Sequence, residues 1–126
     1  MAYKDYDKDL EYHRQWWQRM KQENPERYAQ HRSRMINNIR RVKLASLQHY
    51  SQSEIPFCAC CGEKQLEFLT IDHINGDGRK HRREAGVGSH LYAWLVRNNF
   101  PDGFQVLCFN CNCSKGAYGY CPHEHL

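Results

Sequence analysis

Two pairs of cysteines give the sequence its clearest chemical signal. Cys58 and Cys61 are separated by two residues, and Cys108 and Cys111 repeat that spacing. A Cys-x-x-Cys segment can place two sulfurs at neighbouring corners of a tetrahedron, and two such segments supply the four thiolates of a closed zinc site. We therefore predict that these four cysteines hold a structural Zn²⁺. The segment between the pairs is longer than in a zinc ribbon, which indicates an insertion.

The three remaining cysteines allow more than one interpretation. Cys60 lies inside the first pair and could compete with its neighbours as a ligand. Cys121, with His123 and His125 close by, could bind a second metal, but we favour a tail with incidental thiols and imidazoles, and Cys113 has no evident role. The odd cysteine count argues against a disulfide framework, so we expect reduced thiols.

An Asp-His pair lies between the two cysteine pairs. Asp72 and His73 end a run of apolar and β-branched residues, which predicts a strand over residues 66–73. Asn112 directly follows the last paired cysteine, and Lys115 comes one helical turn later. An Asp-His pair alone is weak evidence for a site. Its position between two zinc pairs, with Cys-Asn-x-x-Lys-Gly closing the module, is much more specific.

In this order the motifs resemble the HNH endonuclease family in its four-cysteine form, over about residues 57–118. The resemblance implies a β-hairpin followed by a helix, with a catalytic Mg²⁺ or Mn²⁺ in the cleft between them. It also implies that His73 is the general base and that Asp72 and Asn112 are the ligands of the catalytic metal. DNA cleavage would then leave a 5′-phosphate and a 3′-hydroxyl. The family is common in phages and mobile elements.

The residue types suit these implied roles. An imidazole titrates near neutral pH, so His73 can take a proton from water. Carboxylate and amide oxygens are ligands that Mg²⁺ accepts, and such an ion can neutralise charge on a strained phosphate. Neighbours on a regular strand point to opposite faces, so Asp72 and His73 flank one phosphate only where the strand twists, bulges or ends. We expect His73 to point into the cleft between hairpin and helix.

One position departs from the family pattern. The family places an Asn shortly before the second zinc pair, where it helps to hold the base, and Gly103 stands at that place here. Asn75, Asn98, Asn99 or a backbone carbonyl could orient His73 instead. The sequence leaves these alternatives open.

The elements that must position these residues predict an α+β fold. In it, a basic two-helix extension (residues 1–56) precedes a zinc-stapled module (residues 57–126), which the resemblance implies is a treble-clef-like ββα-metal nuclease domain. Asn24 and Pro25 are predicted to be the N-cap and first residue of a second helix, whose apolar seam includes Met35 and Val42, with Leu47 beside it. The other expected elements are helices over residues 8–23 and 25–50, a basic loop over 79–83, a helix over 89–98 capped by Ser89, a strand over 104–107 and a helix over 111–116.

The positive charge is concentrated in the first part of the chain. The whole sequence carries a net charge of +4, whereas residues 12–50 hold nine Lys or Arg against two Glu, a net charge of +7. A basic arm of this kind favours an anionic polymer as partner, although a solvated helical face is the simpler alternative. The residues expected to contact DNA are Arg32, Arg40, Arg41, Arg79, Lys80, Arg82, Arg83 and Lys115.

Metal-dependent DNA hydrolysis is thus the leading hypothesis. A zinc module that binds nucleic acid without catalysis is the main alternative, and a protein-interaction module using Trp16 and Trp17 is a third. We expect DNA as the partner, with a homodimer or a larger phage assembly as further possibilities. No apolar run has membrane-spanning length and the N-terminus lacks an export pattern, so we expect a cytoplasmic, phage-encoded or bacterial protein without a membrane partner.

Overall fold

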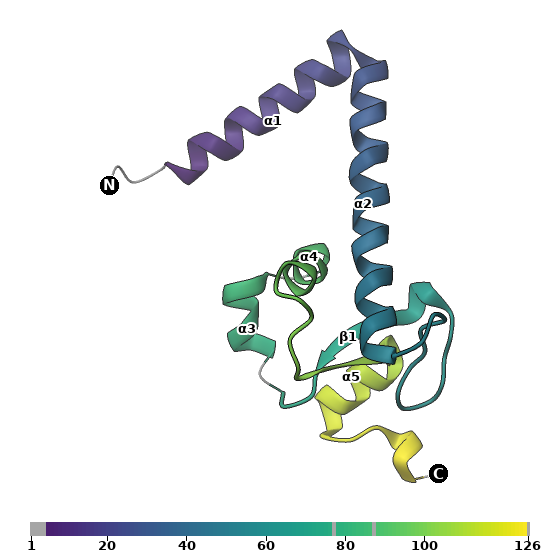
Figure 1. Cartoon of the computed structure of the whole chain (residues 1–126). Helices are drawn as coiled ribbons and strands as arrows, with labels where there is room; N and C mark the ends of the chain where they lie inside the picture. Colours follow the sequence, from purple (N-terminus) through teal and green to yellow (C-terminus); the bar gives the residue numbers. More distant parts are fainter. Residues whose placement is uncertain (1–4, 77, 87, 126) are drawn as a thin grey trace. The chain divides into compact units, whose positions relative to one another are not determined.

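The computed structural model describes residues 5–76, 78–86 and 88–125, without the side chains of residues 6, 79 and 82–84. The chain forms two compact units, one up to Asn38 and one from Ile39 onward, and each is described by itself. Among the described helices, none combines the length and apolar character that a membrane crossing requires. The elements are helices α1 (Tyr6–Glu23), α2 (Pro25–Ser51), α3 (Gly78–Ala85), α4 (Ser89–Arg97) and α5 (Phe109–Tyr118), strands β1 (Leu69–His73) and β2 (Phe104–Cys108), and 3-10 helices η1 (Leu66–Phe68) and η2 (Pro122–His125) (Figure 1).

The first unit contains α1 and the beginning of α2. The Asn24 side chain accepts a hydrogen bond from the Arg27 backbone N–H at 3.2 Å, and Pro25 is the first residue of α2. Pro lacks the N–H that the first turn cannot use, so this N-cap confirms the predicted break between the helices. The Trp17 ring lies against the ring of His31 on α2, with centroids 4.5 Å apart. Trp17 thus packs between α1 and the beginning of α2.

The second unit is built on an antiparallel β-hairpin. β1 pairs with β2 in a register that sets Leu69 opposite Cys108 and His73 opposite Phe104. The predicted strand over residues 66–73 is confirmed from Leu69, whereas its first three residues form η1. The core at this hairpin contains Leu69, Val106 and Leu95 of α4, each at most 1% exposed. This hairpin followed by α5, after two N-terminal helices, confirms the α+β class.

The end of α2 belongs to this second unit. Val42 is 7% exposed and Leu47 is fully buried, but Met35 is 48% exposed. The predicted apolar seam is therefore buried only toward the C-terminal end of the helix. The Tyr50 hydroxyl donates to the Pro101 carbonyl at 2.6 Å, which ties the end of α2 to the segment before β2. Burial of Tyr50, with the negative charge of Asp102 nearby, raises its pKa to about 12.

The insertion between the two strands carries α3 and α4 (Figure 1). The expected basic loop over residues 79–83 is wrong, because this segment lies within α3. His81 and Ala85 are four residues apart and therefore lie on the same face of α3. Ala85 on this face is 6% exposed. The expected Ser89 cap is also wrong. The N-cap of α4 is Gly88, whose φ of 57° suits a residue without a Cβ.

Helix α5 is longer than predicted and ends at a glycine. Gly119 has φ 80° and ψ −7°, and its N–H donates to the Lys115 carbonyl. A left-handed residue at this position satisfies a terminal carbonyl of the helix, and a side chain there would be strained. The helix therefore continues past Gly116, where the sequence suggested it would stop.

Two alanine substitutions in α5 are expected to change stability in opposite directions. Gly119→Ala should lower the free energy of unfolding by about 1–2 kcal/mol, because an L-residue is strained at positive φ. Gly116→Ala should raise it by about 0.5–1 kcal/mol, because Ala loses less backbone entropy and its Cβ meets no heavy atom within 4 Å. Urea denaturation of both variants measures the difference. Equal effects, or a stabilised Gly119→Ala protein, would contradict the assigned cap.

Candidate metal centre and active site

The four paired cysteines converge on one point. The sulfurs of Cys58, Cys61, Cys108 and Cys111 all lie within 4.8 Å of one another. Cys61 Sγ and Cys108 Sγ are 3.7 Å apart. Sulfurs at about 2.3 Å from a tetrahedral Zn²⁺ are separated by about 3.8 Å, so this spacing fits the ion. The predicted four-cysteine metal cluster is confirmed as an arrangement that could hold a structural Zn²⁺.

Local backbone geometry explains why these cysteines meet. The Gly62 N–H donates to the Cys58 carbonyl at 2.9 Å, and its φ of 80° closes the tight knuckle. The Ala59 N–H donates to the Val106 carbonyl at 2.8 Å, which attaches the knuckle to β2. Cys108 ends β2 and is also the N-cap of α5. The cluster therefore joins the knuckle, the hairpin and the final helix.

The electrostatic surroundings of the four thiols are uneven. Burial raises the pKa of Cys58, but backbone N–H groups, first that of Cys61, outweigh burial and lower this pKa to about 7. The sulfur accepts from the N–H groups of Cys60 and Cys61 at 3.4 and 3.5 Å. Burial and the neighbouring thiols raise the pKa of Cys111 well above its usual range. A bound cation would favour all four thiolates, since metal ligands must be deprotonated.

A second feature is a cavity of about 730 Å³ along β1. All five residues of β1 line it, together with residues of α2, α4 and α5. Within the described part of the chain, β1 pairs with β2 alone, so its other edge is unpaired. A strand edge exposes side chains of both faces to the same space. Asp72 and His73 can therefore line one cavity although they alternate along the strand.

The three residues assigned to catalysis, Asp72, His73 and Asn112, all line this cavity. Thr70 and Asp72 lie on the face of the hairpin that meets α5, the helix that carries Asn112. The Asn112 side-chain nitrogen donates to the Thr70 hydroxyl at 2.9 Å, and that hydroxyl donates to the Leu107 carbonyl. The amide of Asn112 is thus held against β1, next to Asp72 on the same strand face.

The carboxylate of Asp72 has one cationic neighbour and one polar neighbour. Lys115 Nζ lies 2.6 Å from Asp72 Oδ2, and the side-chain nitrogen of Gln105 donates to the same oxygen at 2.9 Å. The Asp72 side chain is 13% exposed and the Lys115 side chain 29% exposed. Lys115 therefore forms an ion pair with Asp72. Its position one helical turn after Asn112 is the one expected from the sequence.

His73 lies on the opposite face of the hairpin, toward the insertion. Its Nε2 is 3.0 Å from Nδ1 of His81 on α3, and its ring lies against Phe104 with centroids 4.9 Å apart. The ring of Trp94 packs against His81 in turn. His73 also lines the cavity that residues of α5 line, and its expected direction, into the cleft between hairpin and helix, stays a prediction. His81 is a contact of the His73 ring that the sequence interpretation did not consider beside Asn75, Asn98, Asn99 and a backbone carbonyl, and which group orients His73 stays a prediction.

The residues expected to contact DNA are only partly described. Lys80 is exposed on α3, whereas the side chains of Arg79, Arg82 and Arg83 lie outside the described residues. Arg32 is exposed in the first unit, and Arg40 and Arg41 are exposed on the part of α2 that belongs to the second unit. Their role in binding DNA stays a prediction.

A second group of metal-ligating side chains lies where the sequence interpretation favoured incidental thiols and imidazoles over a second metal. Cys60, Cys111, Cys121 and His123 also bring their ligand atoms within 4.8 Å of one another. Burial, with a hydrogen bond to Cys121, raises the pKa of Cys60 to about 11. The available signal was the Cys121-Pro122-His123 segment together with the extra thiol in the first knuckle. Cys113 and Cys61 are exposed, but only Cys61 belongs to a cluster.

The fold and site together define an α+β protein in which a β-hairpin and the following helix are assembled at a four-cysteine metal cluster. Comparison with protein-family models, curated proteins and solved structures gives no match.

Proposed function

We propose that this protein is a metal-dependent DNA endonuclease of the HNH type. The observation that carries the proposal is that Asp72, His73 and Asn112 line one cavity beside the four-cysteine cluster. These residues come from the end of one strand and the start of one helix, as the resemblance implies. A purely structural zinc module has no need of an acid, an imidazole and an amide around a common space.

The donor set fits a hard divalent cation. Asp72 supplies a carboxylate oxygen that already pairs with the Lys115 ammonium at 2.6 Å, so this position stabilises positive charge. Asn112 donates through its amide nitrogen to Thr70, and its carbonyl oxygen is the atom that suits a metal. Mg²⁺ is commonly held by one or two protein oxygens and several waters. Bound there, Mg²⁺ or Mn²⁺ would neutralise charge on the scissile phosphate.

His73 provides the base. One ring nitrogen, Nε2, faces His81 at 3.0 Å. The other, Nδ1, lies on the side of Gly78, where an added Cβ would sit 3.4 Å away. As the base, the His73 imidazole would take a proton from water and so generate the nucleophile for attack on phosphorus.

The basic residues supply affinity for the polymer. Arg32, Arg40, Arg41 and Lys80 are exposed cations, and cations contact phosphates without reading sequence. We assign them, with Arg79, Arg82 and Arg83, to binding of the DNA backbone. Such binding would hold the scissile phosphate at the cavity.

One observation favours a second candidate, a zinc module that binds nucleic acid without cleaving it. Asp72 is engaged by both Lys115 and Gln105, which is also what a structural carboxylate would show. In that case Lys115 would serve the fold, and the basic residues would account for the whole activity.

A plasmid assay tests the proposal. Zinc-loaded protein is dialysed against buffer without other divalent ions and mixed with supercoiled plasmid, and Mg²⁺ or Mn²⁺ is then added. We expect nicked or linear plasmid after the addition and intact plasmid before it. This design is preferable to EDTA alone, because a strong chelator could also remove the structural zinc.

A gel-shift measurement on the same samples separates the two candidates. Protein that shifts several DNA substrates in Mg²⁺ or Mn²⁺ but leaves all of them intact, while keeping its zinc, would contradict the nuclease and support the binding module. Cleavage that is equally fast without added Mg²⁺ or Mn²⁺ would contradict the assigned metal site.

A further inference from the structure

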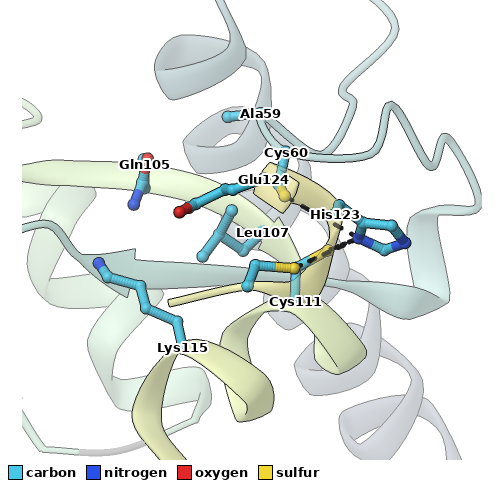
Figure 2. Close-up of a pocket in the computed structure, with 9 residues that line it drawn as sticks. Ala59, Cys60, Gln105, Leu107, Cys111, Lys115, His123 and Glu124 are labelled. Atoms are coloured by element: carbon cyan, nitrogen blue, oxygen red, sulfur yellow. Dashed lines mark hydrogen bonds between the residues drawn. The ribbon is translucent and has the colours of Figure 1, made fainter. Parts of the chain in front are cut away.

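The second group of ligands shares one residue with the four-cysteine cluster. Cys111 belongs to both groups, and Cys60, Cys121 and His123 complete the second one. Figure 2 shows the side chains of Cys60, Cys111 and His123 turned toward one another at a cavity of about 290 Å³. We propose that this group holds a second Zn²⁺, and that the Cys111 thiolate bridges the two ions.

The distances within the group are those of a tetrahedral site. His123 Nδ1 lies 3.3 Å from Cys111 Sγ, 3.3 Å from Cys121 Sγ and 4.0 Å from Cys60 Sγ. A Zn²⁺ with bonds of about 2.3 Å to sulfur and about 2.0 Å to nitrogen separates these two ligand atoms by about 3.5 Å. The three distances lie on either side of that value. One imidazole nitrogen thus faces three sulfurs at ligand spacing, which packing of incidental thiols does not require.

The number of ligands also fits two ions. The two groups have four members each and share one, so they comprise seven side chains. Two four-coordinate ions with one bridging ligand need seven. Six of the seven are cysteines, and their thiolates would more than balance the charge of two dications. Repulsion between ions joined by one sulfur is therefore offset within the cluster.

Burial keeps the shared part of the cluster out of water. Cys111 is fully buried and Cys121 is 4% exposed, while His123 is exposed and η2 presents it at the surface. The second site brings the residue inside the first knuckle, Cys60, to the segment after α5. A second ion would fasten this C-terminal segment to the knuckle. This inference is independent of the nuclease proposal, since it concerns metal content.

The number of bound ions provides the test. The full chain is produced with excess zinc under reducing conditions, desalted, and analysed by native mass spectrometry with elemental analysis as a check. We expect two Zn²⁺ per wild-type chain and one per chain in Cys121→Ser and in His123→Ala. Cys113→Ser is the matched control, because this exposed thiol on α5 lies outside both groups, and it should retain two.

Folding of each variant is verified by circular dichroism, and His123→Ala removes an exposed side chain, so it should keep the fold. A wild-type chain with one Zn²⁺, or variants with the same metal content as wild type, would overturn the second site. Substitution with ¹¹³Cd tests the bridge: two cadmium resonances with mutual scalar coupling are expected, because both nuclei bond to Cys111. Two uncoupled resonances would overturn the shared thiolate.

Discussion

Cys108→Ser is expected to abolish the cooperative unfolding transition of the unit that begins at Ile39. Cys108 is 6% exposed, ends β2, caps α5 and belongs to the four-cysteine cluster. Structural zinc contributes about 10–16 kcal/mol of apparent binding free energy in zinc-finger peptides. A whole domain is usually stable by only about 5–15 kcal/mol. Loss of one thiolate at the junction of hairpin and helix should therefore leave too little stability for the native state.

Thermal unfolding followed by circular dichroism, together with zinc content, measures this effect. Cys113→Ser provides the control, since it makes the same change at an exposed thiol of α5 that lies outside the cluster. It should melt within a few degrees of wild type and retain its zinc. A Cys108→Ser protein with the melting temperature and zinc content of wild type would show that the cluster does not stabilise the fold.

The features that were predictable from sequence depend on short-range patterns. The two Cys-x-x-Cys pairs are recognisable because ligand spacing is a local property, and the helix break at Asn24-Pro25 follows from the chemistry of two adjacent residues. Strand β2 and most of β1 follow from their apolar and β-branched composition. The convergence of Asp72 and Asn112 could be anticipated because each lies next to an element that the cysteines fix.

The features that were not predictable depend on contacts between distant segments. The run from Arg79 to Arg83 has no apolar period, and its helix is stabilised by burial of Ala85 and packing of His81 against Trp94. For this reason the contact between His73 and His81 could not be predicted from sequence. The second metal group likewise joins Cys60 to His123, and neither residue has a metal-ligand spacing that identifies the other.

His73→Ala is expected to lower the rate of DNA cleavage by about 10²–10⁴-fold, the usual contribution of a positioned general base. The imidazole is half-buried at the end of β1, lines the cavity and contacts His81. Its removal should leave the zinc cluster in place, because the ring packs against His81 and Phe104, which are not members of the cluster. Single-turnover cleavage of supercoiled plasmid at saturating Mg²⁺ measures the loss.

His90→Ala is the matched control, because His90 is exposed on α4 and does not line the cavity along β1. It should cleave at a rate close to that of wild type.

Exogenous imidazole distinguishes the loss of a base from a change in fold. The space left by the His73 side chain lies in an open cavity, so added imidazole should restore part of the cleavage by His73→Ala and leave His90→Ala unaffected. If His73→Ala keeps its zinc and melting temperature and cleaves as fast as wild type, His73 is not the base. The proton acceptor would then have to be sought among the other groups that line the cavity, of which Asp72 is the nearest in sequence.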